Sequence, residues 1–180
     1  MSIYKINKKS IIKNLGFSFF IIIAFIITYI YFVYITKESD FIWLLSLILL
    51  GQLIPVILLL TDYFVNSTKE EIIVHGEYIE IKEKNHRKTI QKQEIEGLTI
   101  YASPSWYRNS TVKFFPFEAF HFVEIKLKND NSIYITSLSD HNLYKNIQKE
   151  KLFKGLLYFY KGGITRQGNA INTIFWKKLD

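Results

Sequence analysis

Two long stretches without charge, both near the N-terminus, constrain the fold of this chain more than any other feature. Residues 15–35 and residues 41–61 each contain 21 consecutive residues that lack a charged side chain. A helix that crosses a membrane needs roughly 20 predominantly apolar residues, because each residue advances about 1.5 Å and the hydrocarbon core is about 30 Å thick. Both stretches are therefore predicted to form membrane-spanning helices.

A cleaved signal peptide is the alternative interpretation of the first stretch, because lysines precede its apolar residues. The stretch is longer than the usual apolar core of a signal peptide, which is about 7 to 15 residues. It also ends in the bulky residues 31–35 and carries no small-residue cleavage pattern. We therefore expect the first helix to be retained.

The flanking charges predict how the two helices are oriented. Only residues 36–40 separate them, so they should lie antiparallel with both chain ends on one side of the membrane. The connecting loop holds one lysine and two acidic residues, whereas four lysines precede the first helix: Lys5, Lys8, Lys9 and Lys13. The positive-inside rule then predicts that both ends are cytoplasmic. These four membrane-proximal basic residues are also positioned to attract anionic lipid headgroups.

Three residues of the second stretch are candidates for helix–helix packing, namely Gly51, Gln52 and Pro55. Gln52 lies near the middle, where its amide should seek a partner on the first helix or on another copy of the chain. Pro55 leaves the carbonyl of Gly51 without a donor and is expected to bend the helix. Neither stretch contains an acidic residue, a lysine, an arginine or a histidine, so the sequence does not favour an ion or proton pathway within one chain.

From residue 71 onward, apolar side chains begin to alternate with charged ones, which is typical of half-buried strands. Strands are predicted at residues 71–74, 77–82, 87–93, 95–101, 120–128 and 132–137. The Asn129, Asp130 and Asn131 sequence has the chemistry of a hairpin turn between the last two of these.

One helix is predicted after the strands. Ser139 or Asp140 can cap its start, and the glycines at 162–163 can close it. Its apolar positions fall roughly on one face: Leu143, Ile147, Leu152, Leu156, Phe159 and Tyr160. Antiparallel strands followed by a single helix predict an α+β domain, in which a curled sheet or small barrel has one open end covered by that helix.

This arrangement resembles that of the bacterial membrane-anchored pleckstrin-homology-like (PH-like) proteins, including the YcxB-like group. The resemblance is carried by two apolar helices, by strands with the sequences HGEYIEIKEK and VEIKLKNDNSIYITS, and by the closing helix. It extends to about residue 163. It implies a PH-like split barrel without catalytic residues, acting as a membrane-tethered binding or scaffolding module, and it transfers no functional residues.

The chain is accordingly divided into four parts. Residues 1–14 form a basic cytoplasmic N-terminus, residues 15–65 the transmembrane hairpin with helices at about 15–35 and 41–65, residues 66–163 a cytoplasmic PH-like domain, and residues 164–180 a C-terminal tail. The expected location is the cell (inner or cytoplasmic) membrane, where the protein would be multi-pass.

Residue types that support enzymatic chemistry are scarce. The chain has no cysteine, which excludes disulfides, thiolate metal ligands and thiol nucleophiles. Its histidines are scattered, and no glycine-rich phosphate loop or HExxH sequence is present. We therefore expect no enzymatic activity, no cofactor and no metal site.

One segment between predicted strands has the composition of a contact surface. Residues 101–117 contain Trp106, Tyr107 and Arg108, and aromatic residues mixed with cations are favoured at protein interfaces and at membrane surfaces. These three residues are the candidate contact with a partner or with headgroups. The other aromatics of the segment, Phe114, Phe115 and Phe117, are more simply explained as core or strand residues.

Two functional hypotheses follow from these features. The first is a non-enzymatic, membrane-tethered PH-like module that binds a protein partner or lipid headgroups. The alternative is a small oligomeric membrane effector or channel-like subunit whose cytoplasmic domain acts as a sensor. Nucleic acid is a disfavoured partner despite the formal charge of +7, because lysines alternate with acids along the strands and no reading helix is recognisable.

Overall fold

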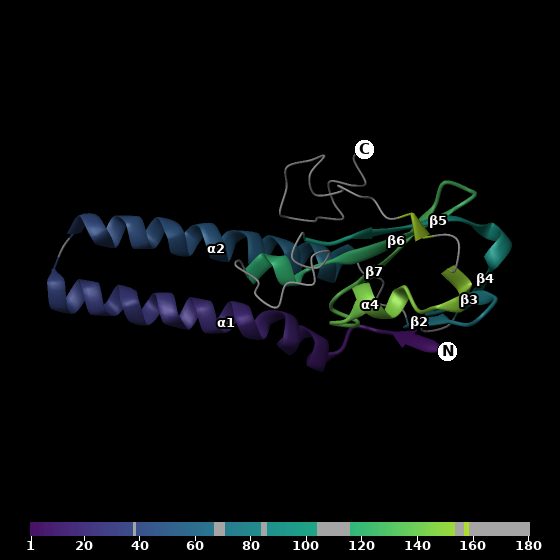
Figure 1. Ribbon diagram of the computed structural model, residues 1–180, viewed down its shortest axis with the longest axis horizontal. Helices are drawn as coiled ribbons and strands as arrows, with labels where there is room; N and C mark the ends of the chain where they lie inside the picture. The colour runs from purple at the N-terminus through teal and green to yellow at the C-terminus, as the bar shows by residue number, and fades with distance from the viewer. Residues whose placement is uncertain (38, 67–70, 84–85, 104–115, 154–156, 159–180) are drawn as a thin grey trace.

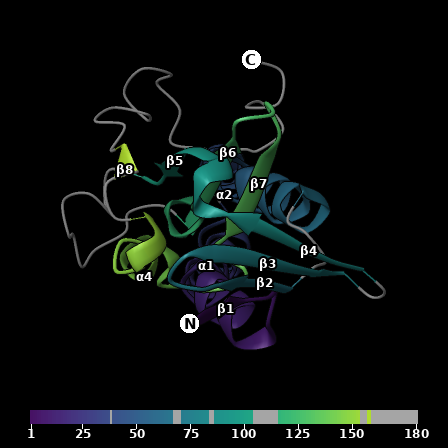
Figure 2. The same cartoon turned by 90° about the vertical axis from the view of Figure 1, so that its right-hand side faces the viewer.

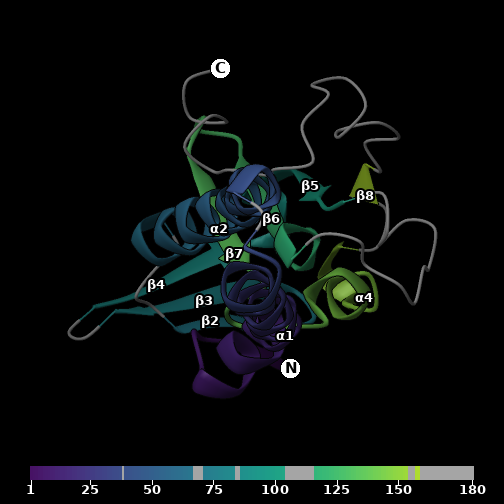
Figure 3. The same ribbon diagram turned by 90° about the vertical axis from the view of Figure 1, so that its left-hand side faces the viewer.

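The computed structural model describes residues 1–37, 39–66, 71–83, 86–103, 116–153 and 157–158. Two long helices lie side by side and project from one end of a domain made of two β-sheets (Figures 1 and 3). Helix α1 spans Lys8–Tyr31 and is continued by a π-helical turn, η1, at Phe32–Thr36. Helix α2 spans Ser39–Asn66. The predicted antiparallel hairpin of helices is therefore present as an element of the fold.

Local features explain where the helices begin and end. The side chain of Asn7 caps α1, because its Oδ1 accepts a hydrogen bond from the backbone N–H of Ser10 at 2.8 Å. Lys37 adopts a left-handed conformation with φ of 56° and ends the π-helical turn. Helix α2 continues through Pro55 as one helix.

At least one of the helices is long and apolar enough to cross a membrane. The segment Ile42–Asn66 qualifies by itself, and only 17 % of its most apolar window is buried within the chain. The segments Lys8–Gly16 and Phe19–Ile35 meet at an angle of 42° and qualify only if they count as one bent span. The described chain therefore holds one such helix, or two with the bent pair.

The first sheet has the strand order β1-β2-β3-β4 and is antiparallel throughout. Its strands are β1 (Ser2–Tyr4), β2 (Glu71–Val74), β3 (Tyr78–Glu83) and β4 (His86–Gln91). β1 precedes the helical hairpin and β2 follows it, so the hairpin is the connection between two neighbouring strands. The pairing of Ile3 with Ile73 sets their register.

The second sheet has the order β7-β6-β5-β8. It follows a short 3-10 turn, η2 (Lys92–Glu94), and contains β5 (Ile95–Tyr101), β6 (Phe122–Leu127), β7 (Ser132–Thr136) and β8 (Leu157–Tyr158). β5, β6 and β7 are antiparallel, whereas β8 runs parallel to β5. Asp130, with φ of 62°, lies in the predicted turn between β6 and β7.

The main core lies between the two sheets (Figure 2). Alternation along the strands sends Ile79 and Ile125 inward, where both are fully buried. Burial of each such side chain contributes about 1.5–3 kcal/mol. Helix α4 (Leu143–Ile147) and the 3-10 turn η4 (Lys151–Phe153) add four buried side chains to this core: Leu143, Ile147, Leu152 and Phe153.

The structure corrects the predicted boundary at the N-terminus. Residues 1–14 were predicted to form a separate basic segment, but Ser2–Tyr4 form a strand of the first sheet and α1 already begins at Lys8. Tyr4 is 3 % exposed and belongs to the main core. A domain that begins at residue 66 would therefore lack one strand of its own sheet.

The predicted closing helix is also wrong in its extent. Among the described residues of this segment, only Leu143–Ile147 is α-helical, and Leu157–Tyr158 forms a strand beside β5. Asn142, rather than Ser139 or Asp140, is the N-cap, and its side chain makes no capping hydrogen bond. Ser139 instead donates its hydroxyl to the carbonyl of Thr136 at 2.7 Å. The predicted positions Leu156, Phe159 and Tyr160 lie outside the described residues.

Candidate contact surface at the hairpin end of the domain

Strand pairing determines which connections lie beside the helical hairpin. β1 leads into α1 and α2 leads into β2, so the helices leave the first sheet at the end of β1. In the second sheet, Phe122 pairs with both Tyr101 and Thr136, so the connection from β5 to β6 and the segment after β7 emerge at one end. Contacts from both helices reach these two connections, and we name this part of the domain the hairpin end.

Helix α2 enters the domain through an aromatic cluster, which we name the foot cluster. Tyr63 is fully buried, and its ring lies edge-on to Phe120 and Phe122 with centroid distances of 5.7 and 6.0 Å. Edge-on aromatic pairs contribute about 0.5–1.5 kcal/mol beyond the area that they bury. The other buried members of the cluster are Val56, Leu59, Ala119, Tyr134 and Leu138.

Helix α1 docks through hydrogen bonds, and we name these contacts the polar seam. The amide nitrogens of Asn7 and Asn14 each donate at 2.6 Å to a backbone carbonyl, Asn7 to Ser139 and Asn14 to Ser137. The hydroxyl of Ser10 also donates to the Ser139 carbonyl at 3.3 Å. Asn14 is fully buried. Because the bonds of Ser10 and Asn14 are buried, losing either leaves a polar group without a partner.

The polar seam was not predicted, although the sequence carries a pattern that indicates it. Asn7, Ser10 and Asn14 are spaced by three and four residues, which places them on one face of a helix. Such a polar stripe directly before an apolar run indicates a helix whose first turns pack against protein.

Two histidines at this end make structural hydrogen bonds. His141 Nδ1 lies 2.9 Å from Asn14 Oδ1, and an amide oxygen only accepts, so His141 carries hydrogen on Nδ1. His121 is fully buried, its Nδ1 donates to the carbonyl of Ala119 at 3.1 Å, and its Nε2 accepts from the N–H of Tyr144 at 3.3 Å. This pairing requires the neutral form of His121.

An acidic side chain is buried on the outer face of the second sheet. Glu124 is 8 % exposed, and its two carboxylate oxygens accept from the hydroxyls of Tyr101 at 3.1 Å and Ser132 at 2.9 Å. Hydroxyl groups on β5 and β7 thus donate hydrogen bonds to the Glu124 carboxylate on β6. Burial and the neighbouring Glu124 charge raise the pKa of Tyr134.

The predicted contact residues Trp106, Tyr107 and Arg108 lie outside the described residues. The two described ends of their segment are at the hairpin end. Ser103 is buried and donates its hydroxyl to the carbonyl of Glu118 at 3.2 Å, which closes the base of the segment. The turn η3 (Pro116–Ala119) lies against both α1 and α2.

The basic residues expected near the membrane surface are all exposed. Lys8, Lys9 and Lys13 lie in the first turns of α1, and Lys5 lies in the connection from β1. Lys13 directly precedes the buried Asn14. The lysines therefore lie beside the hydrogen bonds through which α1 docks onto the domain.

The three residues predicted to pack the helices behave differently from one another. Gly51 is exposed, and a Cβ added there would meet no atom within 4 Å, so it makes no close helix contact among the described residues. Gln52 is half-buried, and its Oε1 is enclosed without a hydrogen-bond partner among the described residues. Pro55 is half-buried. Contact of these residues with another copy stays a prediction.

Within the described ranges, no group of three or more histidine, aspartate or glutamate side chains is arranged to hold a metal ion. The contacts described at the hairpin end are apolar packing, aromatic contacts and hydrogen bonds. Together, the sheets, helices and inserted hairpin define an α+β domain with a helical hairpin between its first two strands.

A family model described as PH domain matches residues 3–139, which is more than half of the chain, and the chain therefore belongs to the PH domain family. The match begins within β1 and ends just after β7, so it spans the helical hairpin as well as both sheets. A comparison with curated proteins gave no significant match. The resemblance to PH-like domains is confirmed, and the YcxB-like subtype stays a prediction.

Proposed function

We propose that this protein is a non-enzymatic PH module that is embedded in a membrane by its hairpin and binds a partner at the bilayer surface. PH domains are in general binding modules rather than enzymes. The membrane part of the proposal rests on the exposed apolar surface of the hairpin, which includes Phe20, Ile27, Leu47 and Ile57. Soluble monomers rarely expose an apolar surface that covers two whole helices.

The orientation follows from charge and from the way in which the hairpin is attached. Four exposed lysines at the base of α1 favour a cytoplasmic base under the positive-inside rule. The polar seam and the foot cluster attach both helices directly to the domain. The domain is then held against the inner face of the cell membrane, with both chain ends cytoplasmic.

One observation supports the binding surface most directly. The segment from β5 to β6 starts and ends at the hairpin end, where Ser103 closes its base and η3 lies against both helices. Under the proposed orientation, the two described ends of this segment face the bilayer surface. We assign partner or headgroup contact to Trp106, Tyr107 and Arg108, whose residue types suit an interface.

Replacing these three residues with alanine tests the assignment in the full-length protein. The isolated domain is unsuitable, because removing residues 1–65 also removes β1. The variant should show weaker pull-down from native membranes, or weaker dependence on anionic lipid in nanodiscs, at unchanged thermal stability. High salt should weaken a headgroup contact more than a protein contact. If all readouts equal those of the wild type, the segment is a passive connection.

Gln52 favours an alternative function, that of an oligomeric membrane effector with a sensor domain. Its enclosed Oε1 has no partner among the described residues, and an unpaired amide in apolar surroundings is unfavourable. Rearrangement of the hairpin in an oligomer could supply a partner. Gln52→Leu should abolish assembly or ion flux if this alternative holds, and should leave function intact if the hairpin is only an anchor.

A further inference from the structure

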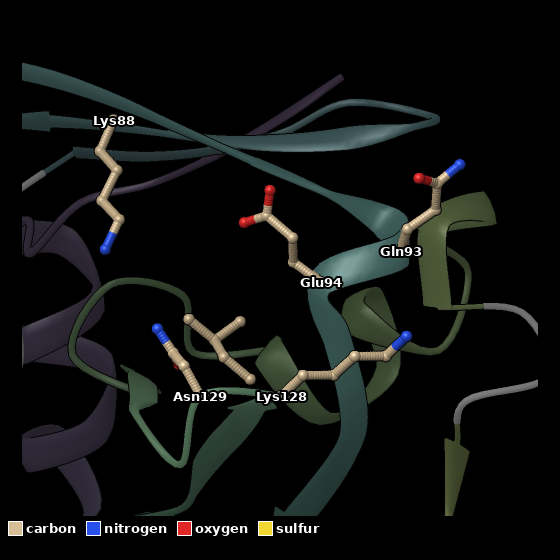
Figure 4. A pocket seen from close by; sticks show the side chains of 6 residues that line it. Lys88, Gln93, Glu94, Lys128 and Asn129 are labelled. Atoms are coloured by element: carbon tan, nitrogen blue, oxygen red, sulfur yellow. The ribbon is translucent and has the colours of Figure 1, made fainter.

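A pocket with charged walls lies at the end of the domain opposite the hairpin. It has a volume of about 300 Å³ and lies between β4 and η2 on one side and the turn from β6 to β7 on the other (Figure 4). A backbone hydrogen bond from the N–H of Lys128 to the carbonyl of Glu94, 2.9 Å long, joins the two walls. The pocket is therefore a fixed feature of the fold, and under the proposed orientation it faces away from the membrane.

Opposite charges face this pocket without pairing to each other. Lys88 and Glu94 both point into the space between the walls (Figure 4). Neither forms an ion pair within 4 Å with any described residue. Lys88 lies two residues from the fully buried Ile90, so it occupies an inward-facing position of β4. The Lys88 side chain is nevertheless exposed, and its ammonium group points toward the pocket (Figure 4).

Asn129 adds a donor whose orientation is fixed by its own turn. Its Oδ1 accepts a hydrogen bond from the backbone N–H of Asn131 at 3.2 Å. The amide nitrogen is therefore directed away from the turn, and in Figure 4 it points into the pocket. Lys88 and Asn129 both offer hydrogens, whereas the Glu94 carboxylate only accepts.

The remaining lining consists of Leu127, Gln93 and Lys128, and together with the volume it limits the size and polarity of a ligand. Leu127 is 4 % exposed, belongs to the main core and supplies an apolar surface. The volume lies at the lower limit of ligand pockets, which is about 300 Å³. A purely anionic ligand would meet the carboxylate of Glu94, and a purely cationic ligand would meet the ammonium of Lys88.

We propose that this pocket binds a compact zwitterion of the size of an apolar α-amino acid. Lys88 and Asn129 bind its carboxylate, Glu94 binds its ammonium group, and Leu127 contacts its side chain. The protein would then sense a small solute on the aqueous side while its other end contacts the membrane surface. This proposal does not depend on the function assigned to the hairpin end.

Calorimetric titration of the full-length protein in nanodiscs tests the proposal with a matched set of ligands. The set is L-leucine, 4-methylpentanoate, 3-methylbutylamine and inorganic phosphate. L-leucine should bind at least about tenfold more tightly than either analogue with a single charge, because each lacks one charge-assisted contact. Glu94→Gln and Lys88→Gln should each weaken L-leucine binding by about tenfold or more. Glu77→Gln and Lys149→Gln, exposed and outside the pocket, are the matched controls and should bind as the wild type does.

Several results would overturn the proposal. The first is that L-leucine gives no heat of binding up to millimolar concentration. The second is that L-leucine and its single-charge analogues bind with equal affinity. The third is that the pocket variants bind L-leucine as well as the control variants do. If Glu94→Gln bound phosphate more tightly than the wild type bound L-leucine, the pocket would instead be an anion site. Circular dichroism melting of each variant establishes that a loss of binding does not reflect unfolding.

Discussion

The two ends of the domain are held together in different ways. At the hairpin end, two helices pack against the sheets through buried side chains, whereas at the opposite end three short turns face outward. The turns at 75–77, 92–94 and 128–131 are joined largely by backbone hydrogen bonds, such as that from Lys92 N–H to the carbonyl of Glu77 at 3.0 Å. At the hairpin end, side chains make the connections instead, and Asn14 and Tyr63 are fully buried.

This difference determines which side chains can bind a ligand. A side chain that holds two elements together is committed to the fold, and changing it costs stability. A turn that is closed by its backbone leaves its side chains exposed, and they can be changed at little cost. Substitutions of the buried side chains that join elements at the hairpin end should therefore reduce stability, whereas substitutions of the exposed pocket side chains at the opposite end should affect binding alone.

The largest loss of stability is expected from Tyr63→Ala in the foot cluster. Removing a fully buried aromatic side chain leaves a cavity against Phe120 and Phe122, and such changes cost about 3–5 kcal/mol. Denaturant titration of the full-length protein in mild detergent measures the change. Phe64→Ala is the matched control, because Phe64 is 50 % exposed. Equal losses in the two variants would show that α2 is not anchored by this cluster.

A smaller loss is expected from Asn14→Ala in the polar seam. The substitution removes the donor to the Ser137 carbonyl and the acceptor for His141, and a buried polar group without a partner costs about 1–3 kcal/mol. Lys13→Ala changes the exposed neighbouring position and should be nearly neutral. The same denaturant titration compares them. A seam that contributes nothing would leave both variants as stable as the wild type.

The smallest effect concerns alkaline pH and the strand β1. Burial raises the pKa of Tyr4, and the nearby Glu150 and Asp140 charges raise it further. Above about pH 10 the unfolded state loses the phenolic proton while the folded state keeps it, so stability falls as pH rises. Tyr4→Phe should make this fall shallower by up to about 1.4 kcal/mol per pH unit.

Unfolding of wild type and Tyr4→Phe between pH 8 and about pH 11 measures that slope. Tyr134→Phe should act in the same direction, because the pKa of Tyr134 is also raised. Parallel stability curves for the wild type and Tyr4→Phe would mean that Tyr4 is not buried in the folded protein.

Elements with a local pattern could be predicted from the sequence. The strands from residue 71 to residue 101 were predicted to within two residues of their observed ends, because alternation on a half-buried sheet is encoded locally. The turn at Asn129 to Asn131 was found because its chemistry is specific.

Elements that depend on distant partners could not be predicted in this way. β1 has three residues, too few to show alternation, and its partner lies beyond the whole hairpin. The segment after Phe153 has apolar residues at helical spacing, yet Leu157–Tyr158 pairs with the edge of β5. Tertiary contacts outweighed local propensity there. The pocket at the opposite end was also missed, because Lys88, Glu94 and Asn129 come together only in the folded chain.

The central claim is that the hairpin crosses a membrane and holds the domain on its cytoplasmic side. The chain has no cysteine, so single cysteines can be introduced at Lys37, between the two helices, and at Lys149, in the domain. In sealed inside-out vesicles, a membrane-impermeant maleimide should label Lys149→Cys at once and Lys37→Cys only after detergent is added. Labelling of both without detergent would contradict a membrane crossing, and labelling of Lys37→Cys alone would reverse the orientation.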